Sequence, residues 1–453
     1  MKSKWLAMLM AVVMVFACIP AVSLADAADV EHIVVWTDSA HDQSVRDRQV
    51  EEFNATIGKE LGIVIDYTVF GTNYADTLQV AMQAEDGPDL FSPSSNTFAN
   101  FVQSGKVVPI SDLEGSESLL SLYNPAELLQ GSQVFDGKVY SLPYSLTSYK
   151  MIINKDLFDL AGLTEPPKTW DEVREYARLI TEAAQGSAYG YFLALKSGWC
   201  QDHYIYSVSA PSIGHFGFDA VRGEYRFSDG LPVIENLLGM IEDGSMFPGF
   251  ETLDADTARA QFSAGRIGIA MAASFDVGVY TEQFPAVCNW VVCDPPALTA
   301  DGYKYKEMTT AVNLLAVSKM ALKKDTAKVA KVLEWFYADE NLVELYEKGM
   351  HIPFSSNVVR MAKESQVYGW KEFSTFENDQ SIIRMADPKG MLKYEGLSAR
   401  ETLAKLLSGG FTEDAETVLK ELDDRLNAAF KALDPELQAS YIAQPGYTVE
   451  RSK

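Results

Sequence analysis

The stretch that decides the fold is residues 32–91, which contain HIVVW (32–36), IVIDYTVF (63–70) and DLF (89–91). These runs are mainly apolar, and the first two are rich in β-branched residues, which is typical of strands. Between them, apolar residues recur every three or four positions over 50–61 and again over 78–82, which predicts two helices. The alternation of strand and helix predicts a parallel sheet covered by helices, so the chain begins as an α/β protein.

A second α/β region begins near the segment DGKVYSLPY (136–144). Residues 149–153 form a further strand candidate. The segments TWDE (169–172) and SARE (398–401) are typical of helix N-termini, because the first and fourth side chains can each bond the other's backbone N–H. No low-complexity linker separates the regions, which predicts two closely connected α/β lobes.

Length and composition limit the class of protein. With 453 residues the chain is too long for one compact core, since domains hold roughly 150 residues each. Its hydrophobic content of 47% excludes disordered and fibrous classes. A net charge of −25 repels phosphate backbones and anionic lipid heads, so nucleic acid is not an expected partner. The acidity favours a neutral or a cationic ligand.

Residues 1–25 have the pattern of a secretory signal peptide. Two lysines precede an apolar run that ends in the small residues of SLA (23–25). Cleavage after this segment predicts a protein exported across the cytoplasmic membrane, to the periplasm or the cell surface. The alternative interpretation is a lipoprotein signal, VFAC (15–18), in which a lipid on Cys18 anchors the chain to the membrane.

Catalytic signatures are absent from the sequence. It contains no phosphate-binding loop, no dinucleotide-binding glycine motif, no HExxH zinc motif and no GxSxG nucleophile elbow. The cysteines after the leader, Cys200, Cys288 and Cys293, are odd in number and are interpreted as free thiols. No cofactor is predicted, and the chain is not expected to be an enzyme.

Asp38, His41 and Asp42 stand together ahead of the first predicted helix and have side chains that bind metal ions. Short polar residues in that position more often cap the helix. Capping is therefore the preferred interpretation, and no metal site is predicted.

Aromatic and short polar residues gather where predicted strands end. In open α/β sheets, ligands bind beyond the C-terminal ends of the strands. Flat aromatic faces stack on sugar rings, and Asp, Asn and Ser bond hydroxyl groups, so the combination suits a neutral polyol, although an isolated Trp or Tyr can instead belong to the core. The residues predicted from this pattern to contact the ligand are Trp36, Asp38, Ser95, Asn96, Tyr144, Thr147, Ser274, Phe275 and Asp276.

An ordered set of segments resembles the extracellular solute-binding proteins of ABC importers, in particular the family that binds sugars and oligosaccharides. The matching segments are IVVW (33–36), GPDLF (87–91), QSG (103–105), VPI (108–110), DGKVYSLPY (136–144), NKDLF (154–158), EPPKTWDE (165–172), FSAGR (262–266), MAASF (271–275) and GFTEDA (410–415). The resemblance implies a two-lobed periplasmic-binding-protein fold of type II, with a mostly parallel sheet flanked by helices in each lobe and a hinge between the lobes.

The resemblance also implies a division of the chain and a function. Lobe one is expected at 26–142 plus about 308–350, and lobe two at 143–307 plus about 351–453. A monomeric receptor would bind a sugar or oligosaccharide in the cleft between the lobes and deliver it to the membrane permease of an ABC importer. Additional candidates for the cleft are Trp199, Asp202 and Trp370.

Several positions depart from the pattern of maltodextrin binders. A Trp and an Asp-Arg pair that follow Gly-Pro-Asp in that group fall here on Pro93, Asn96 and Thr97. Thr147 replaces an acidic residue, and Phe275 replaces a Trp but can still stack on a sugar. Maltodextrin is therefore not the expected ligand. Two alternatives stay open: a cationic solute such as a polyamine, suggested by the net charge, and a secreted glycosidase that uses two carboxylates.

Overall fold

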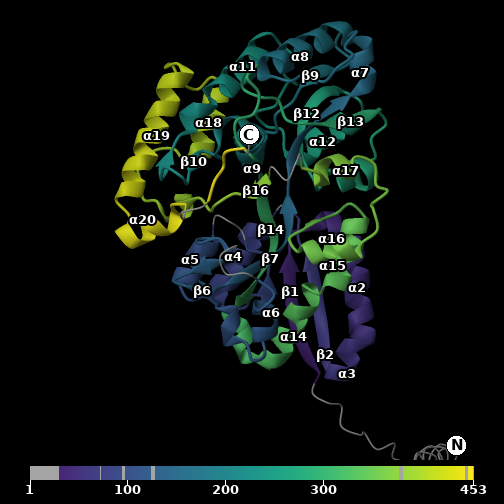
Figure 1. Ribbon diagram of the computed structural model, residues 1–453, viewed down its shortest axis with the longest axis vertical. Coiled ribbons are helices and arrows are strands. Elements are labelled where there is room, and N and C mark those ends of the chain that lie inside the picture. Colours follow the sequence, from purple (N-terminus) through teal and green to yellow (C-terminus); the bar gives the residue numbers. More distant parts are fainter. Residues whose placement is uncertain are drawn as a thin grey trace, which may run out of the picture.

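The computed structural model describes residues 30–71, 73–93, 97–123, 128–376, 381–443 and 447–451. Two α/β lobes lie one above the other, and the long strand β14 (Glu307–Ser318) runs through their junction (Figure 1). Each lobe has its own sheet and its own hydrophobic core. The predicted two-lobed α/β architecture is therefore confirmed. The predicted leader, with Cys18, lies outside the described residues.

Lobe one is built on a sheet with the strand order β15-β7-β14-β3-β1-β2, to which β4 and β16 are added by pairing with β14. The strands are β1 (Glu31–Thr37), β2 (Ile63–Val69), β3 (Leu90–Phe91), β4 (Val107–Val108), β7 (Ser141–Thr147), β14, β15 (Ile352–Pro353) and β16 (Ser381–Ile383). β1 pairs in parallel with β2 and β3, as the strand–helix alternation predicts. β14 runs antiparallel to β3, β4 and β7, and β7 runs antiparallel to β15.

Helices flank this sheet. They are α2 (Gln43–Ala55), α3 (Ile57–Leu61), α4 (Tyr74–Ala84), α5 (Phe98–Gln103), α6 (Glu117–Leu120), α14 (Thr326–Phe336), α15 (Asp339–Glu347) and α16 (Ser356–Met361). The helix predicted over 50–61 is two helices, α2 and α3, interrupted at Thr56. Gly62 ends α3 with a φ of 65°, a left-handed conformation that glycine adopts without a Cβ clash, and β2 then begins directly.

Lobe two contains a four-stranded sheet in the order β13-β8-β12-β9. Its strands are β8 (Tyr149–Asn154), β9 (Tyr189–Tyr191), β12 (Ile267–Ala273) and β13 (Trp290–Cys293). Two short hairpins lie outside both large sheets: β5 (Val134–Phe135) with β6 (Lys138–Val139), and β10 (Phe218–Asp219) with β11 (Glu224–Tyr225). β8 is antiparallel to both β12 and β13, whereas β12 is parallel to β9. Both large sheets thus contain parallel and antiparallel strand pairs, which corrects the expectation of mostly parallel sheets. The reason is that the strands that carry the chain between the lobes run antiparallel to their neighbours in each sheet.

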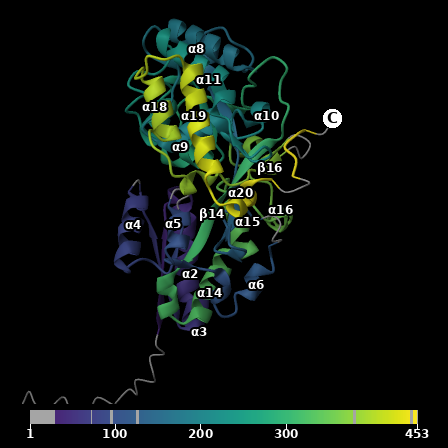
Figure 2. The same ribbon diagram turned by 90° about the vertical axis from the view of Figure 1, so that its left-hand side faces the viewer.

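Helices also surround the sheet of lobe two. They are α7 (Lys155–Leu160), α8 (Trp170–Ala184), α9 (Gly198–Gln201), α10 (Ala210–Ile213), α11 (Leu231–Glu242), α12 (Ala255–Ser263), α13 (Asp276–Gly278), α17 (Trp370–Ser374), α18 (Ala399–Leu407), α19 (Ala415–Lys431) and α20 (Pro435–Tyr441). The late helices α18 and α19, drawn in yellow, pack beside α11 (Figure 2). The C-terminal part of the chain thereby completes lobe two.

Both predicted helix N-termini are present. Ser398 and Glu401 form the complete reciprocal pair of bonds at the start of α18. At the start of α8, Thr169 accepts a hydrogen bond from the Glu172 backbone N–H at 3.2 Å, while the Glu172 carboxylate accepts one from the N–H of Lys168 rather than of Thr169. The predicted pair at the start of α8 is therefore shifted by one residue on its acidic side.

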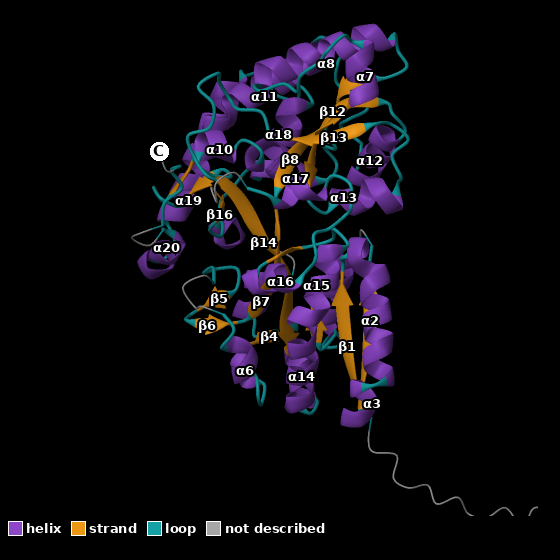
Figure 3. Cartoon of the chain, turned by 45° about the vertical axis from the view of Figure 1, so that its right-hand side comes forward, coloured by secondary structure: helices purple, strands orange, loops and turns teal. Residues whose placement is uncertain are grey.

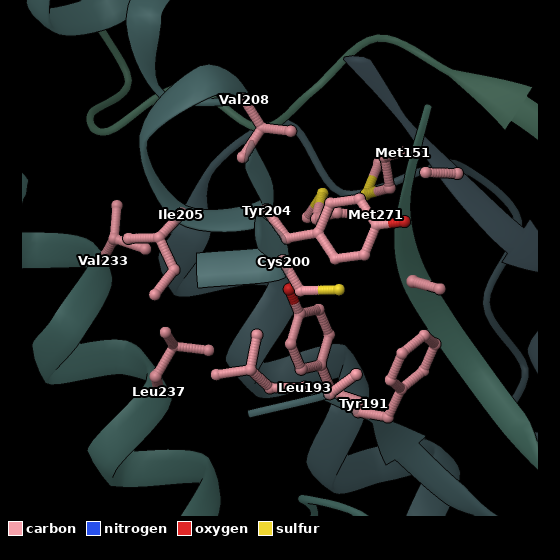
Figure 4. Close-up of a cluster of buried hydrophobic side chains, with 14 of the residues drawn as sticks. Met151, Tyr191, Leu193, Cys200, Tyr204, Ile205, Val208, Val233, Leu237 and Met271 are labelled. Carbon is pink, nitrogen blue, oxygen red and sulfur yellow. The ribbon is translucent and has the colours of Figure 1, made fainter. Parts of the chain in front are cut away.

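The core of lobe two surrounds Cys200. Figure 4 shows its thiol near Tyr191 and Tyr204, with Met151 and Met271 close to the Tyr204 ring. Cys200 is fully buried, and burial raises the pKa of its thiol well above the usual range. The thiolate, which is the reactive form, is therefore disfavoured at this position.

Cys288, two residues before β13, and Cys293, the last residue of β13, are half-buried free thiols. Burial raises the pKa of Cys288 to about 11 and that of Cys293 to about 12. The predicted free thiols are confirmed for all three cysteines of the described residues.

The chain first crosses from lobe one to lobe two at Ser148, between β7 and β8. β7 stays paired with β14 as far as Thr147, so it lies in the sheet of lobe one, although the expected division at 142/143 assigned most of it to lobe two. β14 then leads back to lobe one (Figure 3). β15 still pairs with β7, beyond the expected second boundary at 350/351. We propose boundaries at Ser148, at the start of β14 and in the segment between α16 and α17; β16 then belongs to the C-terminal part of lobe two, although it pairs with the start of β14.

Within the described residues, no helix combines the length and the apolar character that crossing a membrane requires.

Candidate functional site

The candidate site lies at the junction of the two lobes. Lobe one contributes the 3-10 turn η1 (Ala40–Asp42), which follows β1, together with the start of α2, the end of β7 and the turn before β15. Lobe two contributes α9, the π-helical turn η4 (Asp202–Ser207), α12 and the turn after β12. The chain reaches this place because β1 and β12 both end there, and their last residues feed directly into short turns.

Three aromatic rings connect the lobes, and we refer to His41, Phe275 and Trp199 as the aromatic bridge. The ring centroid of His41 lies 5.7 Å from that of Phe275, and the Phe275 centroid lies 6.0 Å from that of Trp199. All three side chains are half-buried. Because His41 belongs to lobe one and the other two rings to lobe two, a molecule held at the bridge would contact both lobes.

Arg259, on α12, lies over the lobe-two part of the bridge. Its guanidinium carbon is 5.3 Å from the Trp199 ring centre and 5.6 Å from that of Phe275, both within the range of a cation–π contact. One guanidinium nitrogen pairs with Asp276 at 2.6 Å. Its Nε is buried without a hydrogen-bond partner among the described residues, so it can donate to an oxygen of a bound molecule.

On the lobe-one side, His41 and Asp42 lie beside His351, which comes from the turn before β15. The Nε2 of His351 is 2.7 Å from Oδ2 of Asp42, and the two histidine ring centroids are 5.0 Å apart. Arg46 completes the cluster, since its Nε is 3.9 Å from Oδ2 of Asp42 and its guanidinium lies 5.1 Å from the ring centre of Tyr144.

The electrostatics of this cluster follow from its burial. Burial lowers the pKa of His41 to about 4, so its ring is neutral at neutral pH. Burial also opposes the charge on Asp42, but the hydrogen bond from His351 and the nearby positive charges hold the pKa of Asp42 below its ordinary value. Asp42 is thus a buried carboxylate held ionised by its neighbours.

The structure does not support the preferred interpretation that these residues cap the first helix. Asp42 occupies the N-cap position of α2, yet its side chain makes no capping hydrogen bond. Ser39 precedes η1 and also makes no side-chain capping bond. The carboxylate of Asp42 turns instead toward His351, a contact between residues 309 positions apart that no local pattern could reveal.

Tyr149 and His203 form a second aromatic contact near the crossing point. Their rings stack at 4.4 Å with an interplanar angle of 8°. The Tyr149 hydroxyl lies 3.4 Å from Oγ1 of Thr310 on β14, which ties the start of β8 to the strand that returns to lobe one. Burial lowers the pKa of His203 to about 3, so it is a neutral ring in this stack.

Two acidic residues predicted to contact the ligand are engaged in ion pairs within lobe two. Asp202 accepts from Lys389 at 3.2 Å and from Arg400 at 2.5 Å. Asp276 is fully buried and accepts from the Tyr204 hydroxyl at 3.1 Å as well as pairing with Arg259. Their carboxylates hold neighbouring side chains in place.

The other predicted residues are spread around the junction. Trp36 is half-buried at the end of β1 and lies 4.7 Å from the ring of Phe70. Asp38 follows two residues later and is exposed, while the protein packed around its carboxyl displaces part of the water and raises its pKa. Trp370 is only 1% exposed and packs against Tyr346, which is the environment of a core residue.

Tyr144 is buried beside His351, with ring centroids 5.6 Å apart. Thr147 and Ser274 are buried where the chain crosses between lobes, and the Ser274 N–H donates to the carbonyl of Ser148 at 3.0 Å. Ser95 and Asn96 lie outside the described residues. Of the predicted residues, the structure thus brings Trp199 and Phe275 into direct contact.

Sequence reasoning missed several residues of the junction, namely Arg46, His203, Arg259 and His351. None follows a strand in the way that Asp38 follows β1, and none belongs to a recognisable motif. Arg259 and His351 reach the site from a helix and a turn whose position depends on the packing of each lobe.

Comparison with known proteins agrees with this architecture. Residues 42–342 match the family described as bacterial extracellular solute-binding protein. Over 403 residues the chain is 24% identical to the maltotriose-binding protein of Pyrococcus abyssi (strain GE5 / Orsay), an alignment that covers 87% of this chain and 81% of that protein.

Solved structures share the fold. An ABC substrate-binding protein from Listeria monocytogenes in complex with cycloalternan has a TM-score of 0.65 and 18% identity, and the match covers 89% of this chain and 100% of that chain. An ABC transporter solute-binding protein from Thermotoga lettingae TMO bound with alpha-D-tagatose has a TM-score of 0.67 and 21% identity, over 88% of this chain and 99% of that chain. The family match spans most of both lobes, and the chain therefore belongs to the bacterial extracellular solute-binding proteins.

Proposed function

We propose that the chain is an extracytoplasmic receptor that binds a sugar or oligosaccharide between its lobes and delivers it to the permease of an ABC importer. The observation that carries the proposal is the aromatic bridge, in which Trp199 and Phe275 of lobe two meet His41 of lobe one. Aromatic faces stack on the apolar faces of sugar rings, and a ligand held there would touch both lobes.

Polar groups at the bridge can orient hydroxyl groups. Arg259 lies over both aromatic rings of lobe two and has a buried Nε without an acceptor among the described residues. Asp38 is an exposed carboxylate next to η1. A donor and an acceptor on opposite lobes provide the orientation that stacking alone lacks.

The comparisons support the ligand class. A relative is named for maltotriose, and two solved structures with the same fold contain cycloalternan and tagatose. The family is one of binding proteins, which argues against the glycosidase alternative. Delivery to a permease is supported by the family and by the leader-like residues 1–25, and it is a proposal for this chain.

A thermal-unfolding screen tests the proposed ligand class. The purified chain is heated with mono-, di- and oligosaccharides, with spermidine as the cationic solute suggested by the net charge of −25, and with amino acids. A ligand present at about 100 times its Kd adds about 2.7 kcal/mol to the free energy of unfolding, which is readily seen. We expect at least one sugar to raise the transition temperature.

Matched tryptophan variants locate the binding site in the same assay. Trp199 and Trp335 are both half-buried, but Trp335 lies on α14 of lobe one, where its ring contacts Phe53 and Phe336. We expect Trp199→Ala to abolish the sugar-dependent shift and Trp335→Ala to preserve it. A shift produced by spermidine and by no sugar would reject the proposed ligand class.

A further inference from the structure

Three side chains able to bind a metal ion meet on the lobe-one side of the junction. His41 and Asp42 lie in η1, and His351 comes from the turn before β15. One ligand atom from each residue lies within 4.8 Å of the other two. We infer that His41, Asp42 and His351 form a binding site for a divalent transition metal ion of the Zn²⁺ type.

The donor set selects the class of metal. Two imidazole nitrogens and one carboxylate oxygen suit Zn²⁺, Co²⁺, Ni²⁺ and Cu²⁺, whereas Ca²⁺ and Mg²⁺ prefer oxygen ligands throughout. Three protein ligands leave at least one coordination position open to water or to an oxygen of a bound solute.

Unsatisfied buried atoms point to a missing partner at this place. Nε2 of His41 and Oδ1 of Asp42 are both buried, and neither has a hydrogen-bond partner among the described residues. Asp42 is 0% exposed, so water does not solvate its carboxylate from outside. Leaving buried polar atoms unpaired costs free energy, and one metal ion would bind both atoms at once.

The geometry requires only a local adjustment. In a tetrahedral zinc site with bonds of about 2.0–2.1 Å, ligand atoms are about 3.3 Å apart. Nε2 of His351 and Oδ2 of Asp42 are 2.7 Å apart and would have to separate slightly, and all three ligand atoms already lie within 4.8 Å of one another. His41 is half-buried in the short turn η1 between β1 and α2, and because its ring lies 5.7 Å from that of Phe275, the adjustment would shift it relative to this ring.

The charges around the site permit a cation. Asp38 and Asp42 are negative and Arg46 is positive on the lobe-one side, with Asp38 and Asp42 both acting on His41. Across the junction the positive charge of Arg259 is matched by Asp276, with which it pairs at 2.6 Å. On the lobe-one side, two carboxylates and one guanidinium thus lie around His41.

Calorimetric titration with Zn²⁺ tests the inference. The purified chain is first dialysed against EDTA, and Zn²⁺ or Ca²⁺ is then added in the absence of any sugar. We expect one Zn²⁺ to bind per chain and Ca²⁺ to give no saturable binding. His41→Ala and His351→Ala are each expected to weaken Zn²⁺ binding by about tenfold or more, since even residues that only support metal ligands commonly cost that much.

His32→Ala is the matched control. His32 also lies beside a carboxylate, with its Nδ1 2.9 Å from Oδ2 of Asp66, but that pair is exposed at the far end of β1. We expect this variant to bind Zn²⁺ with the affinity of the unmodified chain. Circular dichroism and the unfolding temperature in EDTA show whether each variant is folded, and His351→Ala provides the test if His41→Ala is not.

Co²⁺ spectroscopy identifies the ligands independently. Co²⁺ at the proposed site should give visible d–d absorption without the near-ultraviolet charge-transfer band of a cobalt–thiolate bond. A thiolate band would assign the metal to the cysteines and overturn the inference, as would absence of Zn²⁺ binding or full affinity in a folded His41→Ala chain. These measurements contain no sugar, so their outcome is separate from that of the proposed receptor function.

Discussion

Phe275 is the residue on which we expect ligand binding between the lobes to depend most. Its ring touches His41 of lobe one, Trp199 of its own lobe and the guanidinium of Arg259. We expect Phe275→Ala to raise the Kd for the sugar about tenfold, which corresponds to about 1.4 kcal/mol, because the stacking surface is lost.

Phe275→Trp is the control for this substitution, because it restores an aromatic face at the same place and should bind the sugar. The Kd is measured by calorimetry, and the unfolding temperature without sugar shows whether each variant is folded. Equal affinity of the unmodified chain and Phe275→Ala would remove this ring from the site.

Asp229 makes the stability of lobe two sensitive to acid. It accepts hydrogen bonds from His215 at 3.1 Å and from Arg226 at 2.8 Å and 3.0 Å. Burial opposes its charge, but these bonds lower the pKa of Asp229 to about 2. A folded-state pKa below the unfolded one adds stability above the unfolded value, and this stability is lost as the pH falls from about 4 to about 2.

Asp229→Asn tests this pH dependence by removing the titrating group. Because the pKa of Asp229 is lowered by nearly two pH units, we expect the unmodified chain to exceed the variant by about 2 kcal/mol in free energy of unfolding near pH 6. The difference should shrink as urea unfolding is repeated at lower pH. A difference independent of pH would show that Asp229 contributes through packing alone.

Single residues also show where sequence reasoning stops. Asp202 and Asp276 follow or begin turns near aromatic residues, as ligand-binding acids do, yet both are engaged in ion pairs within lobe two. Trp370 is an aromatic residue of the kind that stacks on sugars, but its side chain is buried in the core. Whether a carboxylate is paired depends on cations brought in from distant positions, such as Arg400 beside Asp202.

At the scale of elements, the contact of α8 with β9 depends on a glycine. A Cβ added to Gly190 would come within 2.1 Å of the backbone of Ala177, so the strand can approach the helix only without a side chain there. We expect Gly190→Ala to lower the free energy of unfolding of the chain by about 2 kcal/mol, because an overpacked contact forces the backbone apart.

Gly278→Ala is the matched control for the α8–β9 contact. Gly278 lies in α13, and a Cβ there would meet no atom within 4 Å. Its effect on stability should stay within about 0.5 kcal/mol. Denaturant unfolding of both variants measures the comparison, and equal stability of the two would show that β9 can move away from α8 at no cost.

The local elements were largely predictable and their pairing directions were not. Strand β1, the break at Gly62, strand β2 and the caps of α8 and α18 follow from short patterns, because periodicity and capping act over a few residues. The antiparallel entry of β7 and β14 into one sheet depends on the chain having visited the other lobe in between. No window of sequence contains that information.

At the scale of the whole molecule, two separate hydrophobic cores are joined by crossing segments at Ser148 and along β14. A ligand that contacts both lobes binds best to conformations in which the lobes are together and shifts the population toward them. We expect small-angle X-ray scattering to give a smaller radius of gyration with the sugar identified in the thermal screen.

A sugar that produces no thermal shift is the control for the scattering experiment and should leave the radius of gyration unchanged. Phe275→Ala should need a higher concentration of the binding sugar to reach the same compaction. An unchanged or larger radius with saturating sugar would contradict closure of the lobes around the ligand.

The sequence by itself determined the class of the protein: a secretory leader pattern, alternating strands and helices, the absence of catalytic motifs and the ordered segments that match the solute-binding family. Tertiary structure alone decided which residues share the junction, how the sheets are paired and that Asp42 faces His351 instead of capping α2. The physical reason is range. Backbone periodicity and capping are local, whereas the junction of the lobes is assembled by folding that brings residues 309 positions apart within 2.7 Å.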